Sequence, residues 1–250
     1  MSNKKMKIGI LSLTSCEGCC FALLDQSQQY LDLVKSLDMT FFRLWKDEVD
    51  LSLLKFDAVF VEGSPVTARN IKQLKIARKN SKLLASLGTC AHLGGIYHLK
   101  NYYDKEKLIK QVYTETKGIE NPYVYPVSYY VKVDFVVPTC PISADEFFRM
   151  INEVMIGRLP KIPQHTVCDD CQRRDYECVL QKGEICLGPI TQAGCDAICL
   201  KSKQGCWGCR GLIRDAEVPK LIKLLRKNHS REEIEKALEA FGVKEQIEYE

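Results

Sequence analysis

The residues of this chain with the most distinctive chemistry are its 13 cysteines. Thiolates bind soft metal ions and iron–sulfur clusters, act as nucleophiles or close disulfide bonds. The first three, Cys16, Cys19 and Cys20, stand in the stretch SLTSCEGCCFALLD, directly after an apolar run. The number of cysteines is odd and the N-terminus has no export signal, which disfavours disulfide bonds. In a reducing compartment, thiols in such short spacings more often bind metal.

A denser group of cysteines occupies residues 168–209, a segment with Gly and Pro and almost no periodic apolar pattern. Such a segment cannot build its own core and must be organised by what it binds. Its spacing differs from the C-x2-C-x2-C-x3-C run of bacterial ferredoxins, whereas zinc ribbons stay possible. The thiols divide into two sets of four, drawn from Cys168, Cys171, Cys178, Cys186, Cys195, Cys199, Cys206 and Cys209.

The elements that must position these cysteines alternate between strands and helices. Apolar runs predict buried strands at 6–14, 39–45, 56–63, 82–90 and 133–140. Helical patterns follow at 20–37, 67–81 and 143–157, the last with Ser143 as its N-cap. The stretch 97–130 is predicted only as an excursion with a short helix. This alternation indicates an α/β domain with a mostly parallel sheet over residues 1–157. Residues 158–250 form a second, irregular domain that ends in two helices, at 215–228 and 230–242.

Cysteines from separate loops are expected to meet at one edge of this sheet. Cys16 and Cys19 follow the first strand, Cys90 the fourth and Cys140 the fifth. Ligands of open α/β sheets bind beyond the carboxyl ends of the strands, so these loops converge on one four-thiolate site. By ligand type alone, zinc and an iron–sulfur cluster suit this site equally. Glycines beside the thiols leave room for a cluster but are equally explained as turn residues.

The charge and hydropathy of the chain exclude other classes of partner. Lys and Arg total 36 against 32 for Asp and Glu, and the excess of +4 is too small and too scattered for a nucleic-acid-binding face. No stretch approaches the ~20 continuous apolar residues of a transmembrane segment. The basic N-terminus leads into a first core strand rather than a signal peptide. We therefore expect a cytoplasmic protein.

Several motifs, taken together, resemble one known family. They are C-x2-C at 16–19, EGS at 62–64, GTCAHLGG at 88–95, PTCP at 138–141, CLGPITQAGC at 186–195 and GCWGCRG at 205–211. From residue ~6 to ~212 the chain resembles the small subunit of nickel–iron hydrogenases. It is most similar to cytoplasmic members of the sulfhydrogenase and viologen-reducing type, which lack export signals and carry three cubane clusters.

The resemblance implies a flavodoxin-like first domain and three 4Fe–4S clusters. Periplasmic members have histidine where Cys168 falls and proline where Cys199 falls, so this chain is expected to differ from them. Thr139 stands where many members have glycine. The implied ligands are Cys16, Cys19, Cys90 and Cys140 for the proximal cluster, Cys168, Cys171, Cys178 and Cys186 for the distal cluster, and Cys195, Cys199, Cys206 and Cys209 for the medial cluster.

Two further residues near the proximal site have open roles. Cys20 is either a spare thiolate that exchanges with Cys19, as the tandem cysteines of the complex I homologue suggest, or a small buried residue. We favour the second interpretation. His92 either donates a hydrogen bond to a cluster sulfur or is an ordinary loop residue. Glu17 and Glu62 are expected at a partner interface or on plain surface.

The function implied by the resemblance is electron transfer between a nickel–iron centre in a separate large subunit and an outer redox partner. This chain alone should not split hydrogen. The acceptor could be a flavoprotein, a ferredoxin-like protein or a disulfide reductase. A complex I-type 20 kDa subunit, a zinc-stabilised adaptor and a flavin carrier are the alternatives. For a permanent partner interface, we expect apolar residues beside the proximal cysteines, with Phe21 and Ile96 as candidates.

Overall fold

The computed structural model describes residues 5–42, 44, 50–120 and 122–248. Residues 43 and 45, at the end of the predicted strand 39–45, lie outside this part. The contacts within the chain divide it into two compact units, Met1–Pro160 and Lys161–Glu250. Within the described residues no helix is both long and apolar enough to cross a bilayer.

The first unit is built on a five-stranded sheet in which every neighbouring pair of strands is parallel. The order β2-β1-β3-β4-β5 is that of the flavodoxin-like doubly wound fold, so the prediction of the fold is confirmed. The strands are β1 (Met6–Ser12), β2 (Leu37–Phe42), β3 (Phe56–Glu62), β4 (Ser81–Leu87) and β5 (Phe135–Val137).

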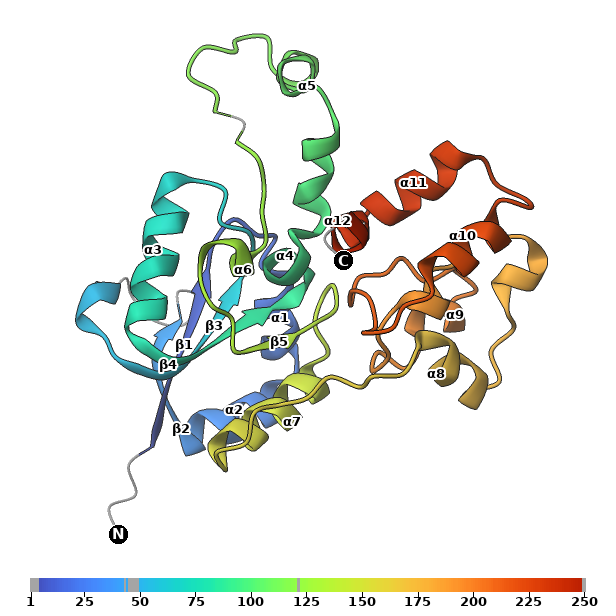
Figure 1. Cartoon of the computed structure of the whole chain (residues 1–250). Helices are drawn as coiled ribbons and strands as arrows, with labels where there is room; N and C mark the ends of the chain where they lie inside the picture. The colour runs from blue at the N-terminus through green and yellow to red at the C-terminus, as the bar shows by residue number, and fades with distance from the viewer. Residues whose placement is uncertain (1–4, 43, 45–49, 121, 249–250) are drawn as a thin grey trace. The chain divides into compact units, whose positions relative to one another are not determined.

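Helices cover both faces of this sheet, which is why its strands are apolar throughout rather than alternating. Figure 1 shows α3 and α6 on one side and α2 and α7 on the other. The predicted N-cap is confirmed, because Ser143 Oγ accepts a hydrogen bond from Glu146 N at 3.3 Å. The helices after the strands are α1 (Gly18–Asp25), α2 (Ser27–Ser36), α3 (Ala68–Lys79), α4 (Gly88–Leu93) and α7 (Ala144–Met155).

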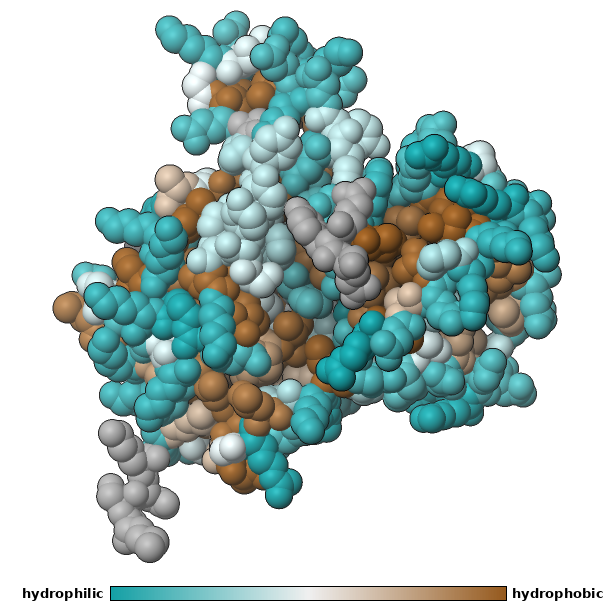
Figure 2. Space-filling view, viewed as in Figure 1, coloured by the Kyte–Doolittle hydropathy of each residue, from teal (hydrophilic) through white to brown (hydrophobic). Residues whose placement is uncertain are grey.

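Two predicted segments of the first unit differ from the structure. The fourth strand ends at Leu87, earlier than predicted, and α4 begins at once, so Cys90 lies on a helix. Its apolar run continues into α4, and periodicity alone does not separate a short buried helix from a strand. The excursion holds more helix than predicted, namely η2 (Gly95–Tyr102), α5 (Lys105–Val112) and α6 (Val127–Tyr130). Helix α5 buries none of its residues, and Figure 2 shows the region around this helix, at the top of the view, as largely hydrophilic.

The second unit combines an irregular cysteine-bearing segment with helices at the C-terminus. We expected this segment to build no core of its own. Its Leu187 and Ile190 pack with Leu221 and Ile234 of the C-terminal helices, so these helices supply part of the apolar contact. The described residues form three C-terminal helices rather than the two predicted, since a third follows at 243–248. The elements are α8 (Val167–Arg173), η3 (Val179–Lys182), η4 (Gly188–Ile190), α9 (Ile198–Lys201), α10 (Val218–Leu225), α11 (Arg231–Glu239) and α12 (Val243–Glu248).

Candidate metal centre

The four cysteines of the proximal set come from three segments that follow strands of one parallel sheet. Cys16 lies in the loop after β1, and Cys19 lies in the first turn of α1. Cys90 lies in α4 directly after β4, and Cys140 follows β5. The carboxyl ends of parallel strands share one edge, so the topology brings these thiols to the same place.

Mutual effects on their pKa values show that these thiols are neighbours. Burial raises the pKa of Cys90 to about 12, and the charges of Cys140 and Cys16 contribute to this rise. The pKa of Cys19 is raised first by burial, then by Glu62, with smaller effects from Cys140 and Cys90. The pKa of Cys140 is raised by burial and then by Cys16. The structure therefore groups all four thiols, while their role as ligands is a prediction.

Bare backbone surrounds this group of thiols. Gly88 has φ +81°, and a Cβ there would overlap Cys19 Sγ. Gly95 has φ +59°, and a Cβ there would lie 2.7 Å from Cys90 Sγ. Only glycine meets both conditions at these positions, because other residues rarely adopt a positive φ and carry the Cβ that has no room. The glycines thus keep space beside the thiols rather than merely forming turns.

Beneath the proximal set lies a buried polar group that the sequence did not reveal. Glu62, at the end of β3, is 2% exposed, so neither the interface nor the surface role expected for it is correct. Its carboxylate accepts hydrogen bonds from Cys19 N at 2.9 Å and from Cys20 Sγ at 2.7 Å. Ser12 Oγ donates to Glu62 Oε2 at 3.4 Å and lies 3.2 Å from Glu17 Oε2.

Cys20 is completely buried and bonded within this polar group. Burial raises its pKa above the usual range, and the charge of Glu62 raises it further. The thiol therefore keeps its proton in the absence of metal. This agrees with the interpretation of Cys20 as a buried residue, and adds a hydrogen-bond partner that the interpretation did not include.

The histidines take different positions. We expected His92 in a loop, but it is half-buried in the last turn of α4. His98, which we had not singled out, is 3% exposed, and its ring lies 5.2 Å from that of Tyr102. In the second unit, His165 Nε2 lies 3.0 Å from Asp170 Oδ1, and Asp170 Oδ2 accepts a hydrogen bond from Gly194 N at 3.0 Å.

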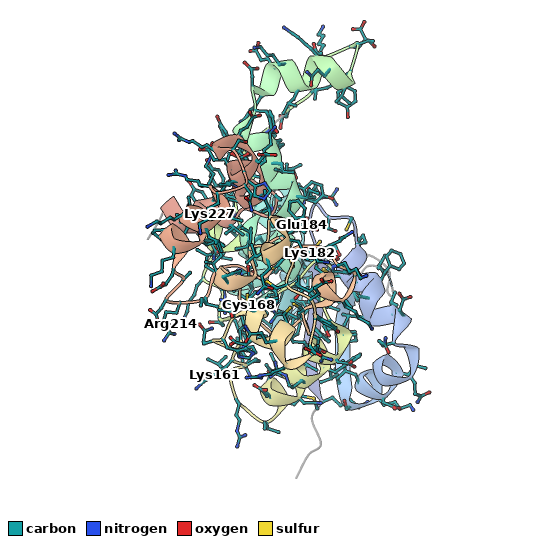
Figure 3. All side chains as sticks on the ribbon, turned by 90° about the vertical axis from the view of Figure 1, so that its right-hand side faces the viewer. Lys161, Cys168, Lys182, Glu184, Arg214 and Lys227 are labelled. Carbon is teal, nitrogen blue, oxygen red and sulfur yellow. The ribbon has the colours of Figure 1, made fainter. Side chains whose placement is uncertain are left out.

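The predicted distal set also forms one group of thiols in the second unit. Cys168 and Cys171 lie on α8, Cys178 precedes η3 and Cys186 precedes η4. Burial raises the pKa of Cys168 to about 12, and the charges of the other three thiols follow as causes. A Cβ on Gly188 would lie 3.3 Å from both Cys168 Sγ and Cys186 Sγ. Figure 3 labels Cys168 among the side chains of this unit.

Two thiols of the predicted medial set, Cys199 and Cys206, have neighbouring thiols among the causes of their raised pKa. The pKa of Cys199 is raised by burial, then by Cys195 and Cys186. The pKa of Cys206 is raised chiefly by burial, with smaller contributions from Cys186 and Cys209. Cys206 N also donates to Cys186 Sγ at 3.2 Å, so the distal and medial sets are adjacent. The grouping of all four of these thiols in one set stays a prediction.

The spacing of the ligand atoms bears on what these sets can hold. In the described part of the chain, the one trio of His, Cys, Asp or Glu ligand atoms within 4.8 Å of one another is Glu17, Cys20 and Glu62. Among these described residues, no three thiols of any predicted set are that close. A single zinc ion with Zn–S bonds of about 2.3 Å needs sulfurs roughly 4 Å apart, whereas a cube of iron and sulfide holds them further apart. The thiol-only donor sets are of a kind that holds an iron–sulfur cluster, and the bare backbone leaves room for it.

Comparison with known proteins identifies the family of this chain. The family model described as NADH ubiquinone oxidoreductase, 20 Kd subunit, matches residues 16–154. Sulfhydrogenase 2 subunit delta of Pyrococcus furiosus is 35% identical, over 95% of this chain and 99% of that protein. A subunit of the F420-non-reducing hydrogenase vhu of Methanocaldococcus jannaschii is 32% identical, over 82% of each chain.

A solved structure shows the same fold. A chain from the NAD+-reducing [NiFe]-hydrogenase in the H2-reduced state superposes with a TM-score of 0.56 at 25% identity, over 64% of this chain and 96% of that one. The family match lies within the first unit, and the relatives extend the similarity over nearly the whole chain. The chain therefore belongs to the NADH ubiquinone oxidoreductase 20 Kd subunit family, among the small subunits of hydrogenases.

Proposed function

We propose that this chain carries three 4Fe–4S clusters and relays electrons between the nickel–iron site of a large subunit and an outer redox partner. The proposed ligands are Cys16, Cys19, Cys90 and Cys140 for the proximal cluster, Cys168, Cys171, Cys178 and Cys186 for the distal cluster, and Cys195, Cys199, Cys206 and Cys209 for the medial cluster.

One observation carries the proposal. Four thiols from three separate strand ends meet at one edge of the sheet, with glycine backbone where side chains would fill the space between them. The bare backbone beside these thiols leaves room for a cluster, which favours a cluster over a zinc-stabilised adaptor. A flavin carrier is disfavoured as well, because Cys16 and Cys19 occupy the loop after β1 where a phosphate would bind.

The chain's own residues would hold the clusters, keep water away and set their potentials. When bound, a 4Fe–4S cluster stores and passes one electron at a time. Burial raises the pKa of Cys90 and Cys168, so cluster binding must displace protons from these thiols. In the second unit, the N–H groups of Gly188 and Cys206 already point to Cys186 Sγ, at 3.4 Å and 3.2 Å. Hydrogen bonds of this kind to a cluster thiolate raise its reduction potential.

The proposal includes a permanent partner at the proximal edge. Phe21 and Ile96, next to the proximal cysteines in sequence, are 54% and 57% exposed, as an apolar interface would require. The outer acceptor is a flavoprotein, a ferredoxin-like protein or a disulfide reductase. We place the complex in the cytoplasm, because so many reduced thiols require a reducing compartment.

A complex I-type 20 kDa subunit or another iron–sulfur carrier is the alternative. The family match at residues 16–154 covers the proximal set only, and the eight later cysteines lie outside it. Those cysteines, and the relatives that match nearly the whole chain, favour the hydrogenase assignment.

Metal analysis of the untagged complex, purified without oxygen, tests the proposal. We expect about twelve irons and twelve sulfides per chain, from three clusters of four. Cys16→Ser should remove about four irons, whereas Cys20→Ser, which changes a neighbouring buried thiol, should remove none. Zinc in place of iron, or full iron content in the Cys16 variant, would contradict the ligand assignment. Mass spectrometry of the same preparation identifies the large subunit and the acceptor, and a large subunit without nickel would favour the complex I-type alternative.

A further inference from the structure

Two adjacent cysteines lie in the first turn of α1, and their thiols point to different surroundings. Cys19 is 9% exposed and Cys20 is fully buried. Successive side chains on a helix are about 100° apart, so one loop conformation directs only one of the two thiols to the proximal set. Cys19 Sγ lies against Gly88 at that set, whereas Cys20 Sγ points to Glu62 and Ser12.

One carboxylate holds both cysteines in this arrangement. Glu62 Oε1 accepts the backbone N–H of Cys19 at 2.9 Å, and Oε2 accepts the thiol of Cys20 at 2.7 Å. The backbone of Glu62 is fixed, because this residue ends β3 and pairs in parallel register with Ser12 of β1, whose hydroxyl also donates to Oε2 at 3.4 Å. A carboxylate that is 2% exposed is costly to bury unless its oxygens are hydrogen-bonded, and its donors Cys19 N and Cys20 Sγ lie in the first turn of α1.

We propose that Glu62 is a positioning residue that makes Cys19, and not Cys20, the ligand of the proximal cluster. Its Oε1 accepts the backbone N–H of Cys19, and its Oε2 accepts the thiol of Cys20. For Cys20 to replace Cys19, the thiol must leave a buried hydrogen bond and the first turn of α1 must rotate away from Glu62. The inference rests on the proposed function, since it requires a cluster at Cys16, Cys19, Cys90 and Cys140.

Electron paramagnetic resonance of the reduced proximal cluster, in the complex co-produced with its large subunit, tests the inference. Glu62→Ala removes both acceptors, so we expect two overlapping proximal signals, one from each choice of ligand. The double variant Glu62→Ala/Cys20→Ala should return to a single signal, because the competing thiol is gone. Cys20→Ser in the wild-type background keeps a donor for Oε2 and should leave the signal unchanged.

A gentler variant decides the question if the Glu62→Ala complex does not accumulate. Glu62→Gln keeps one acceptor oxygen of similar shape and replaces the other by an NH2 group, so the hydrogen bond to Cys19 or to Cys20 must change. We expect the proximal lines to shift while iron content stays at the wild-type level. Glu146→Gln is the matched control, since Glu146 is also a buried glutamate of the first unit but lies on α7. It should leave the proximal lines in place.

Two results would overturn the role of Glu62. One is an unchanged proximal signal in both Glu62 variants; the other is a second signal that persists after Cys20 is removed. The Cys16→Ser variant separates this from a failure of the proposed function. If that variant keeps all its iron, no cluster binds at the proximal set and both proposals fail. If it loses about four irons while the Glu62 variants behave as wild type, only the positioning role fails.

Discussion

At the scale of single residues, Thr139 has the least favourable backbone conformation beside the proximal set. Its φ is 95°, a region that β-branched residues rarely adopt. Its carbonyl accepts the N–H of Thr89 at 3.1 Å, which ties the loop of Cys140 to the start of α4. The conformation is thus imposed by the connection between two cysteine-bearing segments, and glycine would adopt it without strain.

We predict that Thr139→Gly is more stable than Thr139→Ala. Both variants lose the same side-chain contacts, so their difference isolates the cost of a Cβ at positive φ. Glycine also has the larger unfolded-state entropy, which offsets part of this cost. The free energy of unfolding of Thr139→Gly should therefore exceed that of Thr139→Ala by about 0.5–1 kcal/mol. Denaturant unfolding followed by circular dichroism measures this difference. Equal midpoints, or a more stable alanine variant, would show that the residue carries no backbone strain.

At the scale of elements, the alternation of strands and helices was enough to predict where the proximal cysteines lie. It could not predict that Cys90 sits on a helix, because the apolar run gives no sign of where β4 stops and α4 begins. Nor could it predict the burial of Glu62. A charged residue at a strand end is usually exposed, and its donors Cys19 N and Cys20 Sγ lie on a helix more than 40 positions earlier in the chain. In the second unit, the apolar residues around Leu187 follow no periodic pattern, so the sequence did not predict that Leu187 packs with the C-terminal helices.

The junction between β4 and α4 depends on Gly88, and we predict that Gly88→Ala removes the proximal cluster. The new Cβ would overlap Cys19 Sγ, so the thiol must move away from its set. We expect a loss of about four irons per chain, measured by metal analysis. Gly157→Ala is the matched control, because Gly157 has a similar φ of +78° and no atom within 4 Å of the new Cβ. It should cost about 1 kcal/mol of stability and no iron. If both variants lose iron equally, the effect comes from φ and not from the contact with Cys19.

At the scale of the whole molecule, the two units differ in what holds them together. The first unit has an apolar core between β1, β3, β4 and their helices. Around the cysteine-bearing segment of the second unit, the buried cluster includes Cys171, Cys186 and Cys206 and few large apolar side chains. Such a cluster gains little from the hydrophobic effect when the thiols are not joined through metal.

We therefore predict that removal of iron loosens the second unit first. After anaerobic chelation in the presence of a reductant, amides of residues 168–209 should exchange hydrogen much faster, while those of β1, β3 and β4 stay protected. Hydrogen exchange with peptide mass spectrometry measures both regions in one experiment. Equal protection of the 168–209 peptides before and after chelation would mean that this segment is held by its own packing.

The last prediction concerns the surface beside the proximal set, where Phe21 and Ile96 are more than half exposed. Large apolar side chains at this level of exposure favour a protein partner, and central apolar residues of an interface often contribute most of its affinity. We predict that Phe21→Glu and Ile96→Glu each weaken binding of the large subunit at least about tenfold, with little effect on the stability of this chain.

Leu53→Glu is the matched control, because Leu53 is 79% exposed on η1 (Leu51–Leu53) and lies outside the cysteine-bearing segments. Co-purification of the large subunit, quantified against the iron content of this chain, measures the effect. If the Leu53 variant weakens the complex as much as the other two, surface charge and not a specific apolar contact controls assembly. If none of the three has an effect, the large subunit binds elsewhere.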